Sequence, residues 1–159
     1  METTPDRHAS LDRPLPEITD QTRPFWTAAR QGRLLLQKCG RCGTFNFHPK
    51  PWCVECGSRE LAWTPARPAG TVYSHTVSET VAMNYPGWSR DLPLILCLVD
   101  LDDGARMYIQ LVDCKPEDVR IGMRVEVIFE PISDEAGIPK ARPADKPARS
   151  ARQPESSVR

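Results

Sequence analysis

The sequence predicts a mainly β protein in which an N-terminal helix and a zinc ribbon precede a five-stranded barrel of the OB type. Two Cys-x-x-Cys motifs lie close together, within residues 39–56. Five strand-like segments follow, between residues 70 and 142. Lys115 to Val119, between the third and fourth segments, has a proline at its second position followed by two acidic residues, which indicates one helical turn. This layout is typical of a small Greek-key barrel.

The two ends of the chain differ in composition from its middle. Residues 1–20 hold five acidic and two basic residues, whereas residues 141–159 hold five basic and two acidic residues. Both ends are rich in proline and poor in large apolar side chains, which predicts disorder. We therefore expect a disordered tail at 1–20, a helix plus zinc ribbon at 21–66, an OB-fold barrel at 67–143 and a disordered basic tail at 144–159.

The segment Thr22 to Gly32 is expected to form a short helix. Thr22 can cap it, Pro24 suits its first turn and Gly32 marks its end. Phe25, Trp26 and Ala29 gather on one side by their spacing of three to four residues. Because so short a helix is marginal alone, its aromatic side must pack on its own domain or on a partner, and we predict that Phe25 and Trp26 contact a partner protein.

The strand predictions rest on side-chain type and alternation. Residues 33–38 read as a strand that leads into the first cysteine. Met123 to Phe129 alternates apolar and charged residues, which places one face in a core. The other expected barrel strands are residues 70–79, 92–101, 106–112 and 138–142.

The double Cys-x-x-Cys pattern is the strongest chemical signal in the sequence. A two-residue spacer lets a tight turn aim two thiolates at one metal ion, and Gly43 and Gly57 follow the two motifs. Four thiolates fill a tetrahedral zinc site and leave no position for a catalytic water, so the zinc is structural. The predicted ligands are Cys39, Cys42, Cys53 and Cys56.

The charge pattern disfavours nucleic acid as a partner. Lys plus Arg and Asp plus Glu both number 21, whereas proteins that track a phosphate backbone carry a basic excess. Around the cysteines, Arg41 and Lys50 remain candidates for one small polyphosphate ligand. The segment Thr80 to Asp91 is a long loop of the kind that contacts ligands in OB-type barrels, and Tyr85 and Trp88 are its candidate binding residues.

No Ser-His-Asp arrangement, phosphate-binding loop or carboxylate pair stands out, so we predict no catalytic residue. A Cys-His nucleophile would need His75 beside Cys97 or Cys114, and nothing in the sequence places it there. No segment has the length of a membrane span and the first 20 residues are polar, which indicates a cytoplasmic protein.

The order of these features resembles one known family. The chain resembles the rubredoxin-like zinc ribbon plus OB-fold proteins that accompany thiolases and acyl-CoA hydratases. This family was long labelled a domain of unknown function. The resemblance is carried by the helix with Phe25 and Trp26, the double cysteine motif, Gly70 to Ser74 and Ile138 to Pro143. The resemblance covers residues 22–143. Lys50 and Pro51 depart from the proline-then-arginine order expected there, which weakens a phosphate-binding role for that loop.

This resemblance implies an accessory, non-catalytic subunit of an acyl-CoA thiolase or aldolase complex. The subunit would assist assembly and acyl-CoA binding during carbon–carbon bond cleavage or formation, as in steroid side-chain aldolases. Two alternatives stay open: a single-stranded nucleic-acid-binding protein, because ribbons and OB barrels both serve that purpose, and a stand-alone enzyme using Cys97, Cys114 or His75.

Overall fold

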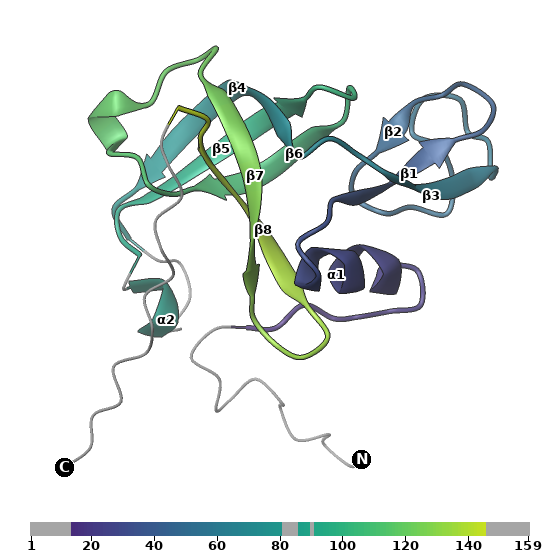
Figure 1. Ribbon diagram of the computed structural model, residues 1–159, viewed down its shortest axis with the longest axis horizontal. Helices are drawn as coiled ribbons and strands as arrows, with labels where there is room; N and C mark the ends of the chain where they lie inside the picture. Colours follow the sequence, from purple (N-terminus) through teal and green to yellow (C-terminus); the bar gives the residue numbers. More distant parts are fainter. Residues whose placement is uncertain (1–13, 81–85, 90, 146–159) are drawn as a thin grey trace.

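The computed structural model describes residues 14–80, 86–89 and 91–145. A three-stranded ribbon sheet and a closed five-stranded barrel lie side by side, and one helix lies against both (Figure 1). The mainly β fold predicted from the sequence, with a helix, a four-cysteine ribbon and an OB-type barrel, is therefore confirmed.

The N-terminal part contains helix α1 and the ribbon. Helix α1 (Arg23–Arg30) is followed by β1 (Leu35–Cys39), β2 (Phe45–Asn46) and β3 (Leu61–Pro65). Strand β1 is central and pairs antiparallel with both neighbours, in the order β2-β1-β3. The segments on either side of β2 carry the two cysteine motifs.

The barrel contains the five expected strands and, between β6 and β7, the expected helical turn. Its elements are β4 (Ala69–Ser78), β5 (Leu94–Leu101), β6 (Arg106–Leu111), the single 3₁₀ turn η1 (Pro116–Asp118), β7 (Arg124–Pro131) and β8 (Gly137–Pro143). The barrel closes in the order β4-β5-β6-β8-β7, with β6 and β8 parallel and every other pair antiparallel. As alternation predicted, Val125 and Val127 in β7 face the core.

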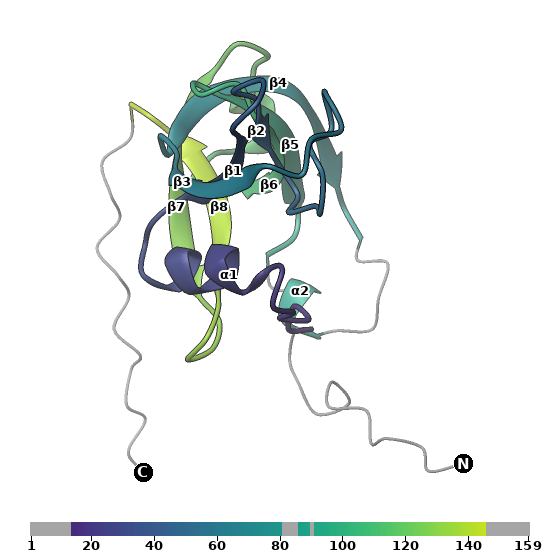
Figure 2. The same ribbon diagram turned by 90° about the vertical axis from the view of Figure 1, so that its right-hand side faces the viewer.

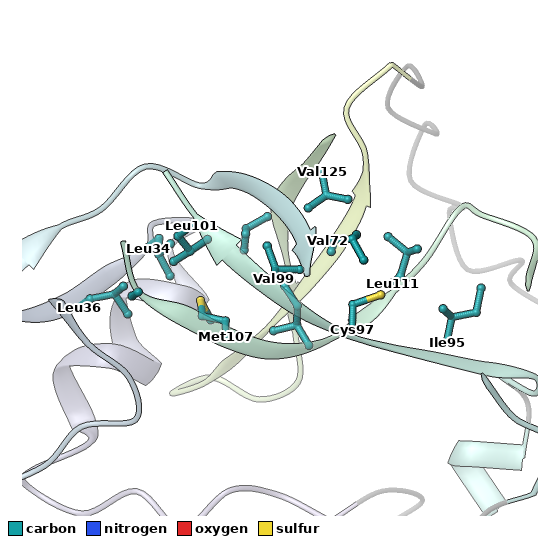
Figure 3. Close-up of a cluster of buried hydrophobic side chains, with 14 of the residues drawn as sticks. Leu34, Leu36, Val72, Ile95, Cys97, Val99, Leu101, Met107, Leu111 and Val125 are labelled. Atoms are coloured by element: carbon teal, nitrogen blue, oxygen red, sulfur yellow. The ribbon is translucent and has the colours of Figure 1, made fainter. Parts of the chain in front are cut away.

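One hydrophobic core joins the ribbon to the barrel. Leu34 and Leu36, from the start of the ribbon, belong to the same buried cluster as the barrel residues Leu101 and Met107 (Figure 3). Both leucines are at most 3% exposed, and Met107 is fully buried. The two halves of the fold therefore stabilise one another through shared apolar burial.

Helix α1 packs closely on the barrel through β8, and Figure 2 shows the helix beside the lower part of β7 and β8. A Cβ atom on Gly137 would lie 2.6 Å from the Ala29 carbonyl oxygen, so only glycine permits this approach. Arg30 Nε also donates a 2.9 Å hydrogen bond to the Ser133 carbonyl oxygen. These contacts hold the helix to its own chain.

The packing of α1 corrects one sequence prediction. Phe25 is only 3% exposed and packs against the rings of Trp26 and Phe47, at centroid distances of 5.0 and 5.6 Å. It therefore belongs to the core, and the prediction that Phe25 contacts a partner is wrong. Trp26 is partly buried against the same core.

None of the helices in the described ranges combines the length and the apolar character that crossing a bilayer requires.

Candidate metal centre

The two cysteine motifs fold into turns with the same hydrogen bonds. In the first, Cys39 N donates to the Thr44 carbonyl oxygen (2.9 Å), and Gly43 N donates to the Cys39 carbonyl oxygen (2.9 Å). The second motif repeats both bonds, from Cys53 N to Ser58 (2.8 Å) and from Gly57 N to Cys53 (3.0 Å). Gly43 and Gly57 both have positive φ, 75° and 71°, as glycine allows at low cost.

These turns bring four sulfur atoms together. All four Sγ atoms lie within 4.8 Å of one another, with 3.7 Å between Cys39 and Cys56 and 3.6 Å between Cys42 and Cys53. Zinc–sulfur bonds of about 2.3 Å in a tetrahedron put the sulfurs about 3.8 Å apart. The arrangement is therefore consistent with a structural zinc ion bound by the four cysteines that the spacing indicated.

Hydrogen bonds in these turns favour the metal-binding thiolate form of Cys42 and Cys53, whereas desolvation and the neighbouring cysteine side chains raise the pKa of Cys56. The Thr44 hydroxyl, with Oγ1 3.3 Å from Cys42 Sγ, and then the Thr44 backbone N–H lower the pKa of Cys42 to about 6. At the second motif, the backbone N–H of Cys56 is the main group that lowers the pKa of Cys53. Because thiolates are the metal ligands, these hydrogen bonds prepare the site for a cation.

A buried asparagine fastens the second motif to the ribbon sheet. Asn46 is 1% exposed, and its Oδ1 accepts a 2.8 Å hydrogen bond from Val54 N, between the two cysteines of that motif. Its Nδ2 donates to the Thr44 carbonyl oxygen at 3.2 Å. Gln37 acts similarly, because its Oε1 accepts from Lys50 N at 2.8 Å. Neither residue was foreseen as part of the site.

Of the four other candidate ligand-binding residues, the structure describes the side chains of two. Arg41, in the first cysteine motif, and Lys50, in the loop between the motifs, are both exposed. Tyr85 lies outside the described residues. Trp88 lies in the short helix α2 (Pro86–Ser89), and its side chain is likewise outside the described part.

The geometry does not support a cysteine nucleophile in the barrel. Cys97 is fully buried in the core, and burial is the main cause that raises its pKa to about 11. His75 is exposed, although its backbone pairs with that of Cys97 across β4 and β5. Cys114 is partly buried against the core. Cys97 behaves as a small apolar core residue.

Comparison with known proteins extends these observations. The chain matches family models described as "ChsH2, rubredoxin-like zinc ribbon domain" at residues 26–62 and "ChsH2, C-terminal OB-fold domain" at residues 63–130. It is 34% identical over 132 residues to a probable enoyl-CoA hydratase alpha subunit of Thermomonospora curvata, covering 83% of this chain and 40% of that protein. This chain thus spans less than half the length of that relative.

Two further matches cover more of the compared protein. A DUF35 domain-containing scaffold protein of Methanocaldococcus jannaschii is 33% identical over 103 residues, covering 64% of this chain and 71% of the relative. A solved chain titled Ltp2-ChsH2(DUF35) aldolase superposes with a TM-score of 0.70 at 32% identity, covering 82% of this chain and 99% of that chain. The chain therefore belongs to the ChsH2/DUF35 family, in which a rubredoxin-like zinc ribbon precedes an OB-fold barrel.

Proposed function

We propose that this chain is a scaffold subunit of a cytoplasmic thiolase-like complex that makes or breaks a carbon–carbon bond next to an acyl-CoA thioester. The observation that carries the proposal is the match to the Ltp2-ChsH2(DUF35) aldolase chain, which extends over 99% of that chain and includes both ribbon and barrel. The matching scaffold and hydratase-subunit relatives support the same class of role. A steroid side-chain retro-aldol reaction is the specific case we favour.

In this proposal the metal has a structural task. Cys39, Cys42, Cys53 and Cys56 would hold zinc, and the ion would supply cross-linking of the two turns rather than an activated water. The ribbon contributes Leu34 and Leu36 to the shared core. Zinc would therefore also support the position of the ribbon on the barrel.

The reacting groups would belong to the partner. Cys97, the one cysteine in the barrel strands, is sealed in the core, and its raised pKa keeps the thiol protonated. This chain would supply surfaces for assembly and for the acyl-CoA. Tyr85, Trp88, Arg41 and Lys50 stay the candidates for acyl-CoA contact, with apolar walls from the first pair and phosphate contacts from the second.

The test compares three preparations: the purified chain, a thiolase-like protein from the same gene neighbourhood, and the two co-expressed. We expect them to co-purify and only the complex to turn over a steroid whose side chain is a β-hydroxyacyl-CoA thioester, measured as release of the short acyl-CoA. A complex with zinc stripped from this chain serves as the control and should lose activity. Equal turnover by the partner alone, or no co-purification, would refute the scaffold role.

A further inference from the structure

Five large apolar side chains in the described part of the chain are at least half exposed, and they gather in two places. Two of them, Trp52 and Val54, lie in the ribbon. The other three lie on the barrel, with exposed fractions of 51, 53 and 72% for Tyr73, Tyr108 and Ile121. We name these three residues and Arg106 the tyrosine face.

Strand pairing brings the two tyrosines to the same outer surface of β4, β5 and β6. Leu98 in β5 pairs with Ser74 on one side and with Tyr108 on the other. Arg106, two residues before Tyr108 in β6, reaches back across β5 and lies over the ring of Tyr73, 3.5 Å from its centroid. Tyr73, Arg106 and Tyr108 therefore form one continuous surface.

Ile121 joins this surface from the other edge of β4. The pairing of β4 with β5 is irregular between Val72 and Ser74, so Tyr73 is the extra residue at this bulge. Bulges redirect side chains, and this one turns Tyr73 outward. Gly122 N donates a 2.8 Å hydrogen bond to the Val72 carbonyl oxygen, so the backbone just after Ile121 runs next to the residue that precedes Tyr73.

The face is held in place before any partner binds. Arg106 Nε and Nη2 donate to the two carboxylate oxygens of Asp100 at 2.6 and 2.9 Å, which fixes the guanidinium against the tyrosine ring. A rigid aromatic side chain loses little conformational entropy on association. Exposed tyrosine and arginine are also the residue types that dominate binding energy at protein interfaces.

The charges at this end of the barrel indicate the kind of partner. Each of three arginines has an aspartate partner: Arg67 with Asp103, Arg106 with Asp100, and Arg124 with Asp102. A nucleic acid needs unmatched cations for its phosphates, whereas an uncharged protein surface does not. The matched charges therefore favour a neutral, apolar protein patch over a polyanion.

The position of α1 indicates which side of the barrel is available. Helix α1 contacts β7 and β8, and β5 lies opposite them in the closed order β4-β5-β6-β8-β7 (Figure 1). The chain thus covers one wall of its barrel itself. The exposed fractions show that the described residues leave the tyrosine face on the opposite wall open.

We infer that the tyrosine face is the surface that docks onto an uncharged apolar patch of the thiolase-like partner. This inference rests on the proposed function and adds to it the surface through which the complex assembles. It also moves the expected contact from the buried Phe25 to the barrel wall opposite α1.

The test measures the dissociation constant of the complex for the wild-type chain and for the double variant Tyr73→Ser/Tyr108→Ser. We expect the double variant to bind the partner at least about tenfold more weakly. Trp52→Ser is the matched control, because it removes an equally exposed aromatic side chain from the ribbon, and it should keep wild-type affinity. Tyr73→Phe should also keep it. Thermal melting of each variant reports whether the chain still folds.

The outcomes separate the two proposals. If the wild-type complex forms and a folded double variant binds as tightly, the docking surface is wrong and the scaffold role stands. If the wild-type chain binds no such partner, the proposed function fails and the docking surface with it. A labelled single-stranded oligonucleotide that binds the wild type but not the double variant would assign the tyrosine face to nucleic acid and overturn the inference.

Discussion

Replacing Asn46 with alanine tests how the ribbon positions its second cysteine motif. Asn46 is buried, and its side chain bonds to Val54 N, inside that motif, and to the Thr44 carbonyl oxygen, beside the first one. In the variant, Val54 N–H loses its acceptor, and the loss of such a part-buried hydrogen bond costs about 0.5–1.5 kcal/mol. The space left by the side chain adds to this cost.

The magnitude follows from these two effects. A total of about 2–3 kcal/mol corresponds to a fall in melting temperature of about 4–12 °C for a chain of this size. Because the lost bonds join the two cysteine motifs, zinc release to a coloured chelator should also become several times faster. Both quantities are measured on freshly purified, zinc-loaded protein.

Ser58→Ala is the control for this experiment. Ser58 Oγ accepts a 3.1 Å hydrogen bond from Glu60 N in an exposed part of the same ribbon, so its loss should change stability by less than about 0.5 kcal/mol. If Asn46→Ala has the same melting temperature as the Ser58→Ala control and releases zinc at the same rate, Asn46 does not position the motif. The hydrogen-bond argument would then be refuted.

Three further predictions concern the helix contact, the metal and the barrel charges. Gly137→Ala should destabilise the chain by about 1–3 kcal/mol because the added Cβ would clash with the Ala29 carbonyl oxygen. Gly40→Ala should cost less, since its Cβ would lie 3.5 Å from its nearest neighbour, the Glu60 carbonyl oxygen. Urea unfolding measures the free energy of both variants. Metal analysis should find one zinc per chain and chelation should lower the melting temperature; iron in the site would contradict this assignment. The hydrogen bond from Arg106 lowers the pKa of Asp100, so this pair stabilises the fold above the ordinary carboxyl pKa and loses that contribution as the pH falls through the lowered value. As the pH is lowered, the melting temperature should therefore fall less for Asp100→Asn than for wild type. An equal fall in both proteins would contradict the pairing.

Regular elements of the fold could be predicted because their signals are local. Alternation in Met123 to Phe129 is enough to give strand β7 and its buried face, and the cysteine spacing is enough to give four clustered sulfurs. Strand β2 has only two residues, too few for any periodicity. It exists because β1 provides a partner for Phe45, a contact made possible by the turn at the first cysteine motif.

Features that depend on distant contacts could not be read from the sequence. Helical spacing shows that Phe25 needs an apolar neighbour, but not that Phe47, 22 positions later, provides it. The tyrosine face depends on a bulge and on an arginine from another strand, so neither Tyr73 nor Tyr108 stands out in the sequence. Asn46 likewise looks like an ordinary loop residue until its burial and hydrogen bonds are known.

The shared core limits where this chain can be divided or fused to another protein. The two family models meet between residues 62 and 63, yet Leu34 and Leu36 on one side of that junction pack with Leu101 and Met107 on the other. Separating the halves there would expose apolar surface on both. A gene fusion should therefore keep the ribbon and the barrel together. The matches to relatives agree with this, since a 103-residue match makes up 71% of a scaffold protein and a 132-residue match makes up 40% of a longer hydratase subunit.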